Sequence, residues 1–258
     1  PTSVAPVADI ASLSISDGTD ALRPATLRGL GPDQTLVLVN GKRRHGSALI
    51  HVNTSVGRGT AGTDLNAIPA SAIQRIEVLR DGASAQYGSD AIAGVINIVL
   101  KDNPEGGAVH ASYGEYTKGD GDTYVVSYNQ GLSLGSDGFL NLDIEYRDRE
   151  NTNRAGLSGQ CQYTCTDLGG GVVQSTDPRE AIFPRQNFRI GDSDSQHLAG
   201  TLNLGLPITN NIEFYAFGTW SDRDNESGGF YRRANQAGNN PTFRSDGVTP
   251  VNNGAAFY

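Results

Sequence analysis

The sequence predicts a mixed α/β domain over residues 1–101, a linker at 102–106, and the start of an antiparallel transmembrane β-barrel over 107–258. Three observations predict this fold class. Up to residue 101, short β-branched runs alternate with tight turns and a short helical segment. From residue 107, the runs lengthen to about ten residues and alternate strictly between apolar and polar side chains. The connections between these long runs are alternately short and long, as in outer-membrane barrels.

The first forty residues carry two kinds of local signal. Before residue 22 the signals are weak: Val7–Leu13 fits one or two helical turns, and Asp17–Asp20 marks a turn. Two short strands are expected within residues 26–31 and at Thr35–Val39. The Asn40-Gly41 pair that follows is typical of a two-residue hairpin turn, which requires positive φ.

The stretch Arg75–Lys101 organises the first domain. A short helix is expected at Pro69–Gln74, followed by a β-favouring run and a turn at Asp81-Gly82. Small residues over Ala83–Ala91 predict a loop in which backbones pack closely. Gly94–Val99 then forms a second strand, rich in β-branched residues.

These residues resemble the plug domain of TonB-dependent outer-membrane receptors. That family's pattern is roughly R-I-E-V-L-R-G, then A-x-Y-G, then G-V-I-N-I-x-x-K. The chain matches it at Arg75–Arg80, Ala85–Gly88 and Gly94–Lys101, with Asp81-Gly82 where Gly-Pro or Gly is common. The resemblance implies that residues 1–101 are a plug enclosed by a 22-stranded barrel, of which about five strands lie in this chain.

The barrel strands are expected at 107–117, 122–133, 138–149, 195–206 and 211–222. Phe139–Arg147 alternates most clearly, with apolar residues on one face and polar or charged residues on the other. The connections at 134–137 and 207–210 are tight, whereas Glu150–Asp194 and the segment after Arg223 are long. Long loops belong on the outer side of such barrels, and aromatic residues such as Tyr113, Tyr146 and Trp220 suit the interfacial girdle.

The Gly-rich stretch His45–Asp64 contains the candidate ligand site of the plug. The resemblance implies that it faces the extracellular side, so His45, His51 and Arg58 become candidate ligand contacts, joined by Arg232 and Arg233 in the last outer loop. Each is equally explained as a solvated loop side chain or a contact with the barrel wall. Gly57–Gly62 also satisfies the dinucleotide pattern G-x-G-x-x-G, but no helix begins within these glycines, and two later turns cannot complete a βαβ crossover.

Two further sets of residues receive structural roles. Arg75 and Glu77 alternate with apolar residues and lie on one strand face, and Arg80 follows at the strand's end; inside a barrel they become contacts between plug and wall. Cys161 and Cys165 fall in a long outer loop, where an oxidising compartment favours a disulfide over two free thiols.

Several classes of protein are disfavoured. A net charge of -8 argues against a nucleic-acid binder, and no run of about 18 apolar residues predicts a transmembrane helix. No catalytic motif or metal-ligand spacing is present, so no enzyme activity, cofactor or metal site is expected. The start at Pro1 without Met indicates a mature or trimmed fragment, and no TonB box is evident.

The resemblance implies active transport of a scarce solute across the bacterial outer membrane, most commonly a ferric siderophore or similar metal chelate. The implied partners are TonB with its inner-membrane energising complex, a small extracellular ligand and outer-membrane lipid. Carbohydrate and cobalamin are alternative cargoes within the same family. A soluble β-rich ligand-binding module is the alternative of another class, and a nucleotide-binding enzyme is a third. The sequence does not identify the cargo.

Overall fold

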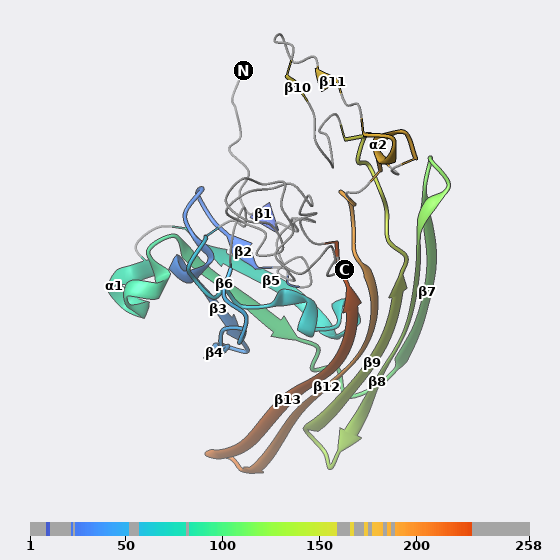
Figure 1. Ribbon diagram of the computed structural model, residues 1–258. Helices are drawn as coiled ribbons and strands as arrows, with labels where there is room; N and C mark the ends of the chain where they lie inside the picture. Colours follow the sequence, from blue (N-terminus) through green and yellow to red (C-terminus); the bar gives the residue numbers. More distant parts are fainter. Residues whose placement is uncertain are drawn as a thin grey trace, which may run out of the picture. The chain divides into compact units, whose positions relative to one another are not determined.

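A computed structural model describes residues 9–10, 22, 24–51, 57–80, 83–158, 166–167, 173–174, 177–182, 185–186 and 189–228. Within these ranges the chain forms a four-stranded sheet, a five-stranded sheet and two short strand pairs (Figure 1). We call the four-stranded sheet the plug sheet and the five-stranded sheet the wall. Both belong to one compact unit, made of residues 1–152 and 191–228.

The plug sheet has the strand order β4-β3-β6-β5. Its central strands β3 and β6 are parallel, while β4 and β5 lie antiparallel on either side. The predicted hairpin is confirmed, because Asn40 and Gly41 adopt φ angles of 48° and 74° between β3 and β4. The strand bounds are β3 Thr35–Val39, β4 Lys42–Arg43, β5 Ile73–Leu79 and β6 Gly94–Leu100.

The central strands carry the core of the plug. Leu36–Val39 of β3 are buried, as are Val95, Ile96 and Ile98 of β6. Gly94 opens β6 at a φ of +142°, where an added Cβ would lie 2.6 Å from the carbonyl oxygen of Leu79. Only glycine fits this approach between β5 and β6.

The connections of the plug differ from the expected ones in three places. The predicted loop after residue 82 contains a short helix, α1 (Ala83–Tyr87), because its Ala-rich sequence favours helix over coil. The helix expected at 69–74 is a single 3-10 turn, η4 (Ala70–Ala72), after which the chain is already extended. Asp9–Ile10 forms a strand, β1, rather than a helical turn and pairs with β2 (Ala25–Thr26).

Three other short 3-10 turns complete the plug connections: η2 (Pro32–Gln34), η3 (Leu65–Ala67) and η5 (Ser89–Ala91). No helix in the described ranges is both long and apolar enough to cross a membrane.

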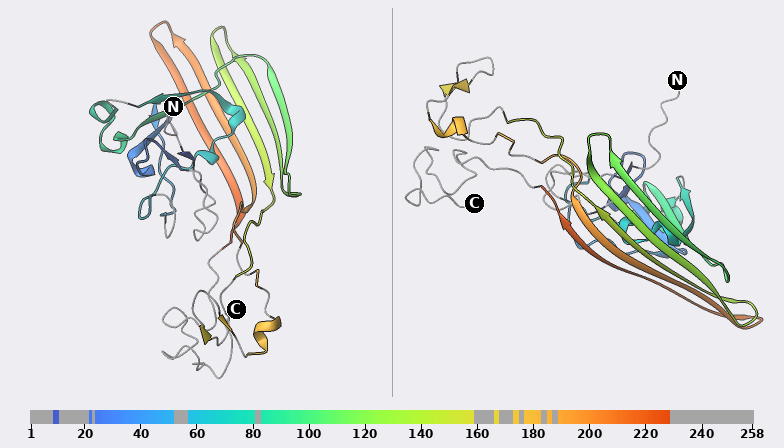
Figure 2. Two further views of the ribbon diagram at one scale, coloured as in Figure 1. Left: turned by 90° about the horizontal axis from the view of Figure 1, so that it is seen from above. Right: turned by 90° about the vertical axis from the view of Figure 1, so that its right-hand side faces the viewer.

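The wall is an antiparallel sheet with the order β13-β12-β9-β8-β7, and its long strands run side by side (Figure 2). Every strand predicted for the wall is confirmed to within a few residues. The strand expected within 26–31 in the plug is wrong, because the chain turns at Leu27–Leu30 directly after β2. Short connections join β7 to β8, β8 to β9 and β12 to β13, whereas the chain between β9 and β12 is long. The strand bounds are β7 Gly107–Tyr116, β8 Asp120–Leu134, β9 Gly138–Arg149, β12 Asp194–Thr209 and β13 Ile212–Glu226.

The two faces of the wall are reversed relative to a water-soluble sheet. Neighbours on β9 show this: Glu145 is only 3% exposed, while Ile144 is 51% exposed. The buried polar side chains share one face, where the wall contacts the plug, and the apolar ones share the other. The buried set includes Ser127, Asn129, Asn141, Asp143, His197, Thr201 and Asn203, and the exposed set includes Val126, Tyr128, Leu142, Tyr146, Leu198 and Leu202. This is the pattern of a barrel wall with lipid outside and a polar lumen inside.

Tyrosines gather on the apolar face at the end of the wall where β9 leads into the long connection to β12. The rings of Tyr113 and Tyr124 are 5.0 Å apart, and the Tyr113 hydroxyl lies 2.8 Å from a carboxylate oxygen of Asp122. Tyr146 donates in the same way to Asp148, at 3.1 Å. An apolar ring with its hydroxyl turned towards charged groups suits a membrane interface.

A second compact unit consists of residues 153–190 and 229–258. Its described part contains the pair β10 (Thr166–Asp167) and β11 (Val173–Gln174) and the short helix α2 (Arg179–Ile182). Arg185 bonds the buried Glu180 at 2.9 Å. Cys161, Cys165, Arg232 and Arg233 lie outside the described residues, so their predicted roles stay predictions.

Candidate functional site

The Gly-rich segment of the plug folds back on itself as an irregular hairpin. The amide of Ser47 donates to the carbonyl of Gly62 at 2.8 Å, and the amide of His51 donates to that of Thr60 at 2.8 Å. Gly57–Thr60 is a turn closed by the Thr60 side chain, whose hydroxyl donates to the Gly57 carbonyl at 2.6 Å. The glycines therefore form a turn and do not lead into the N-terminus of a helix, so the geometry that a dinucleotide phosphate needs is not formed here.

The three candidate ligand residues of this segment have different surroundings. His45 and Arg58 are exposed. His51 is only 2% exposed, its Nε2 atom has no hydrogen-bond partner in the described part of the chain, and burial lowers the pKa of its imidazole. His51 is thus a packed, buried side chain, while His45 and Arg58 remain accessible from the surface. Their role in ligand binding stays a prediction.

Polar contacts join the plug to the wall along a line that we call the plug–wall seam. Asp64 forms an ion pair with Arg223 of β13 at 3.0 Å, and each side chain is 14% exposed. Asp64 also caps η3 by accepting from the Asn66 amide at 3.1 Å. Arg44 donates to the Thr219 hydroxyl of β13 at 2.6 Å. Burial lowers the pKa of the Arg44 guanidinium, an effect that the nearby Asp64 carboxylate opposes.

The same seam continues towards the middle of the wall. Ser71 of η4 donates to the Asp143 carboxylate of β9 at 2.8 Å. Asn40 at the plug hairpin donates to the Asn203 amide oxygen of β12 at 3.1 Å. Phe217 of β13 adds an apolar contact with the plug core. Lys42 of β4 also lies over the ring of Tyr215 of β13, with its Nζ 5.5 Å from the ring centroid. The other seam contacts described here are hydrogen bonds and an ion pair.

Sequence reasoning missed the seam residues on the wall. Asn129, Asn141 and Asn203 each stand at a lumen-facing position of a strand, although asparagine is depleted in strands. Their repeated presence on one face was a usable signal for a polar contact with another part of the protein. Asp64 and Arg44 carried no comparable signal, because single charges in a polar loop are commonplace.

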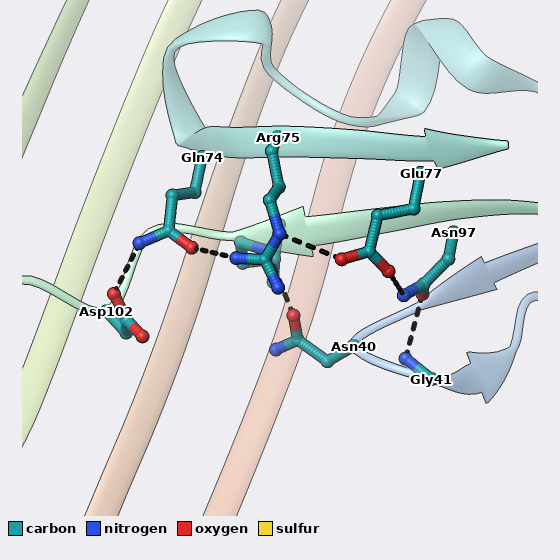
Figure 3. A network of polar contacts seen from close by, with 8 residues as sticks. Asn40, Gly41, Gln74, Arg75, Glu77, Asn97 and Asp102 are labelled. Atoms are coloured by element: carbon teal, nitrogen blue, oxygen red, sulfur yellow. Dashed lines mark hydrogen bonds and ion pairs between the residues drawn. The ribbon is translucent and has the colours of Figure 1, made fainter.

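The predicted plug–barrel contacts Arg75 and Glu77 lie on the exposed face of β5, where Figure 3 shows them in a row of polar side chains. Arg75 donates to Glu77 at 2.8 Å and to Gln74 at 2.7 Å. Asn97 donates to Glu77 at 2.8 Å, and these bonds from Asn97 and Arg75 lower the pKa of Glu77. Asn97 in turn accepts from the Gly41 amide at 2.9 Å (Figure 3).

In the described residues, the side-chain bonds of Arg75 and Glu77 thus remain within the plug and do not reach β7–β13. The Arg80 carbonyl likewise accepts from Arg28 of the plug, at 3.1 Å. The role of all three in contacting the remaining wall stays a prediction.

A surface ion pair fixes the short helices to the plug sheet. Arg43 of β4 bonds the Asp90 carboxylate in η5 and the carbonyl oxygen of Tyr87 in α1. The bond from Arg43 lowers the pKa of Asp90. Both side chains are about half exposed, at 51% and 46%, so this pair differs from the enclosed Asp64–Arg223 pair.

Comparison with known proteins identifies the first domain. Residues 4–95 match the family model described as TonB-dependent Receptor Plug Domain. A ferric enterobactin receptor, PirA of Pseudomonas aeruginosa, is 33% identical over 230 residues, covering 77% of this chain and 30% of the relative. A probable TonB-dependent siderophore receptor, PirA of Acinetobacter baumannii, is 38% identical over 133 residues, covering 51% of this chain and 17% of the relative. The chain thus spans less than a third of these relatives.

A solved structure supports the fold. The ferric enterobactin receptor PfeA, in complex with BCV-L6, superposes with a TM-score of 0.62 at 22% identity, covering 85% of this chain and 30% of that one. The matched part includes plug and wall together, which agrees with the inside-out strands described above. The chain belongs to the family of TonB-dependent receptors, which reside in the outer membrane of Gram-negative bacteria.

Proposed function

We propose that the protein of which this chain is a part takes up a ferric siderophore or a similar metal chelate through the outer membrane, driven by TonB. Two relatives, matched over 230 and 133 residues, carry siderophore-receptor names. The partners would be TonB with its inner-membrane energising complex, the extracellular chelate and the surrounding lipid. We assign no catalytic step to the chain.

The observation that carries this proposal is the polar character of the plug–wall seam. Hydrogen bonds and ion pairs exchange with water at little net cost, so they can break and re-form in each cycle. His197 Nε2 and Thr201 Oγ1 are buried on the wall face without a protein partner in the described ranges, which weakens the seam further. A dry apolar interface of the same size would hold the plug far more firmly.

The alternatives from another class fit the structure less well. A soluble binding module would bury the apolar face of its long strands, but here Ile144 and Tyr146 are exposed while Asp143 and Glu145 are buried. Cobalamin and carbohydrate remain alternative cargoes, and the uptake experiment below separates them from a ferric chelate.

We propose His45 and Arg58 as ligand contacts of the plug, because both are exposed on the Gly-rich segment. Arg232 and Arg233 would supply further positive charge for an anionic chelate from an outer loop. We further propose that Cys161 and Cys165 form a disulfide in the other long loop, and that Arg75, Glu77 and Arg80 face the part of the wall beyond β13.

The test is uptake by a deletion strain that carries the full-length receptor. We expect growth on a ferric siderophore under iron limitation, and we expect loss of that growth in a strain that lacks TonB. Binding of the labelled chelate to whole cells should persist without TonB, since binding precedes the energised step. Uptake of cobalamin or an oligosaccharide, but of no ferric chelate, would refute the proposed cargo.

A matched pair of variants tests the ligand contacts. Arg58→Ala should weaken binding of the labelled chelate, because it removes an exposed charge from the Gly-rich segment. His51→Ala should change the stability of the plug but not chelate affinity, since that side chain is buried. Equal losses of affinity in both variants would argue against the assignment.

A further inference from the structure

The linker between plug and wall is not a free tether. Residues Lys101–Gly106 lie along five wall residues, which we call the linker dock: Gln130, Gly131, Ser133, Asn141 and Asn203. Nothing in the sequence of the linker, which is rich in Asp, Asn, Pro and Gly, predicted that it would be held in this way.

Hydrogen bonds to the dock recur along the linker. Asn203 donates its amide to the Lys101 carbonyl at 2.9 Å, and Asn141 donates to the Asn103 side-chain oxygen at 2.9 Å. The Ser133 hydroxyl donates to the Pro104 carbonyl at 3.1 Å. At the last linker residue, the Gly106 carbonyl accepts from the Gln130 side chain at 3.0 Å and from the Gly131 amide at 2.8 Å.

Gly131 makes room for this contact. A Cβ added there would overlap the carbonyl oxygen of Asn103 and lie 3.0 Å from the amide nitrogen of Glu105. The backbone of the linker therefore packs directly on the backbone of β8, an approach that only glycine permits.

The plug hairpin is attached to the same place through Asn40. Its side-chain oxygen accepts from the Leu100 amide at 2.9 Å, and its amide nitrogen donates to Asn203 at 3.1 Å. Asn203 therefore links the hairpin, the end of β6 and the wall. An aspartate at position 40 could not make both bonds, because a carboxylate has no donor.

The far edge of the plug sheet is different. In the described residues, no hydrogen bond or ion pair of β5 reaches the five wall strands, and the polar row on β5 bonds within the plug and to Asp102 (Figure 3). Separating β5 from the five wall strands therefore breaks none of the hydrogen bonds of the polar row. Separating Lys101–Gly106 from the linker dock breaks all the hydrogen bonds between them that are described above.

We propose that the linker dock stays closed during transport, so that Lys101–Gly106 is the fixed hinge about which the rest of the plug moves. This inference rests on the proposed function, since it concerns the plug displacement that TonB-driven uptake requires. Asn40, Asn141 and Asn203 would then be positioning residues: they hold the hinge and do not contact the chelate.

Reversible crosslinking in the full-length receptor tests this. In a background with Cys161→Ser and Cys165→Ser, one variant carries Asn103→Cys with Asn141→Cys at the dock. A matched variant carries Asp64→Cys with Arg223→Cys at the seam. A short bis-methanethiosulfonate joins each pair by disulfides, and uptake of the ferric siderophore is measured before and after reduction, so each protein is its own control.

We expect the dock crosslink to leave uptake unchanged and the seam crosslink to stop it until reduction. Loss of uptake in both would overturn the fixed hinge while leaving the proposed function intact, as would loss with the dock crosslink alone. Full uptake in both would also overturn the hinge, because the plug would then not move relative to the wall; absence of ferric-siderophore uptake before any crosslinking would instead count against the proposed function.

Thiol reactivity gives a second measurement that needs no crosslink. In the same background, the thiol of Asn103→Cys should react equally slowly in resting and transporting cells, whereas the thiol of Asp64→Cys should react faster during transport. Adding Gly131→Ala should speed the reaction of the Asn103→Cys variant even at rest, and adding Gly218→Ala, where a new Cβ meets nothing within 4 Å, should not. Faster reaction of the Asn103→Cys variant during transport would overturn the hinge.

Discussion

Loss of the enclosed ion pair at the plug–wall seam should loosen the plug measurably. Asp64 and Arg223 are 3.0 Å apart and each is 14% exposed. Asp64→Asn keeps an oxygen that can cap the Asn66 amide but removes the negative charge that lies 3.0 Å from the Arg223 guanidinium. Removing one partner of a buried pair costs about 3–5 kcal/mol, and the residual exposure of this pair places the expected cost near the lower end, about 3 kcal/mol.

The matched control is Asp90→Asn, which removes the counter-charge of Arg43 in a pair that is about half exposed. Exposed pairs contribute about 0–1 kcal/mol, because water solvates both partners when the pair is broken. The two substitutions make the same chemical change in the same domain. They differ in the exposed fraction of the paired side chains, which is 14% for Asp64 and Arg223 and about half for Arg43 and Asp90.

The assay is pulse proteolysis of the plug in urea, performed on the full-length receptor in liposomes, where the barrel resists the protease. With a denaturant slope of about 2 kcal/mol per molar urea, a loss of 3 kcal/mol lowers the midpoint by about 1.5 M. Asp90→Asn should lower it by less than about 0.5 M. Equal shifts in the two variants would refute the reasoning, because enclosure of the Asp64–Arg223 pair would then have no energetic consequence.

Three other predictions use the same receptor. Because burial lowers the pKa of His51, the contribution of this side chain to plug stability should be constant above about pH 6.5. That contribution should fall as the pH drops towards the lowered pKa, since the unfolded chain binds the proton first. The urea midpoint of His51→Gln should lose this pH dependence, and that of His45→Gln should keep it. Ile144→Arg, on the lipid-facing side in the middle of β9, should cost about 2–4 kcal/mol of barrel stability in liposome folding, whereas Ile212→Arg at the strand start should cost about 0–1 kcal/mol. Gly94→Ala should lower the urea midpoint of the plug by about 1 M or more. The new methyl group would lie 2.6 Å from the carbonyl oxygen of Leu79, and the φ of +142° at position 94 is unfavourable for alanine. An unchanged midpoint would contradict the close packing of β5 on β6.

Much of the fold follows from local patterns. Alternation along Phe139–Arg147 predicts a two-faced strand, and Asn40-Gly41 predicts its hairpin, because both signals depend on neighbours in sequence. The parallel pairing of β3 with β6 has no such signal, since it joins residues as distant as Thr35 and Gly94. The helix α1 was missed because Ala83–Ala91 was interpreted from the small size of its residues and not from the helix propensity of its alanines.

The site was less predictable than the fold. His51 was grouped with His45 and Arg58 by residue type, and only the packing of the segment shows that it is buried. The linker dock depends on Gly131 of β8, Asn141 of β9 and Asn203 of β12, whose meeting point is set by tertiary structure. The residue types on the wall indicated that its contacts are polar, and the tertiary structure shows where those contacts lie.

Under the proposed uptake, the parallel ladder of the plug would also affect how quickly a transport cycle can be completed. Its paired residues, from Thr35 with Gly94 to Val39 with Ile98, lie 59 residues apart in the sequence (94 − 35 and 98 − 39). Pairings of such high contact order form slowly, because the long intervening segment must lose conformational entropy before the hydrogen bonds of the ladder can form. A receptor that unravelled β3 from β6 for every molecule imported would have its turnover limited by refolding, so rapid import requires that this ladder survive each passage.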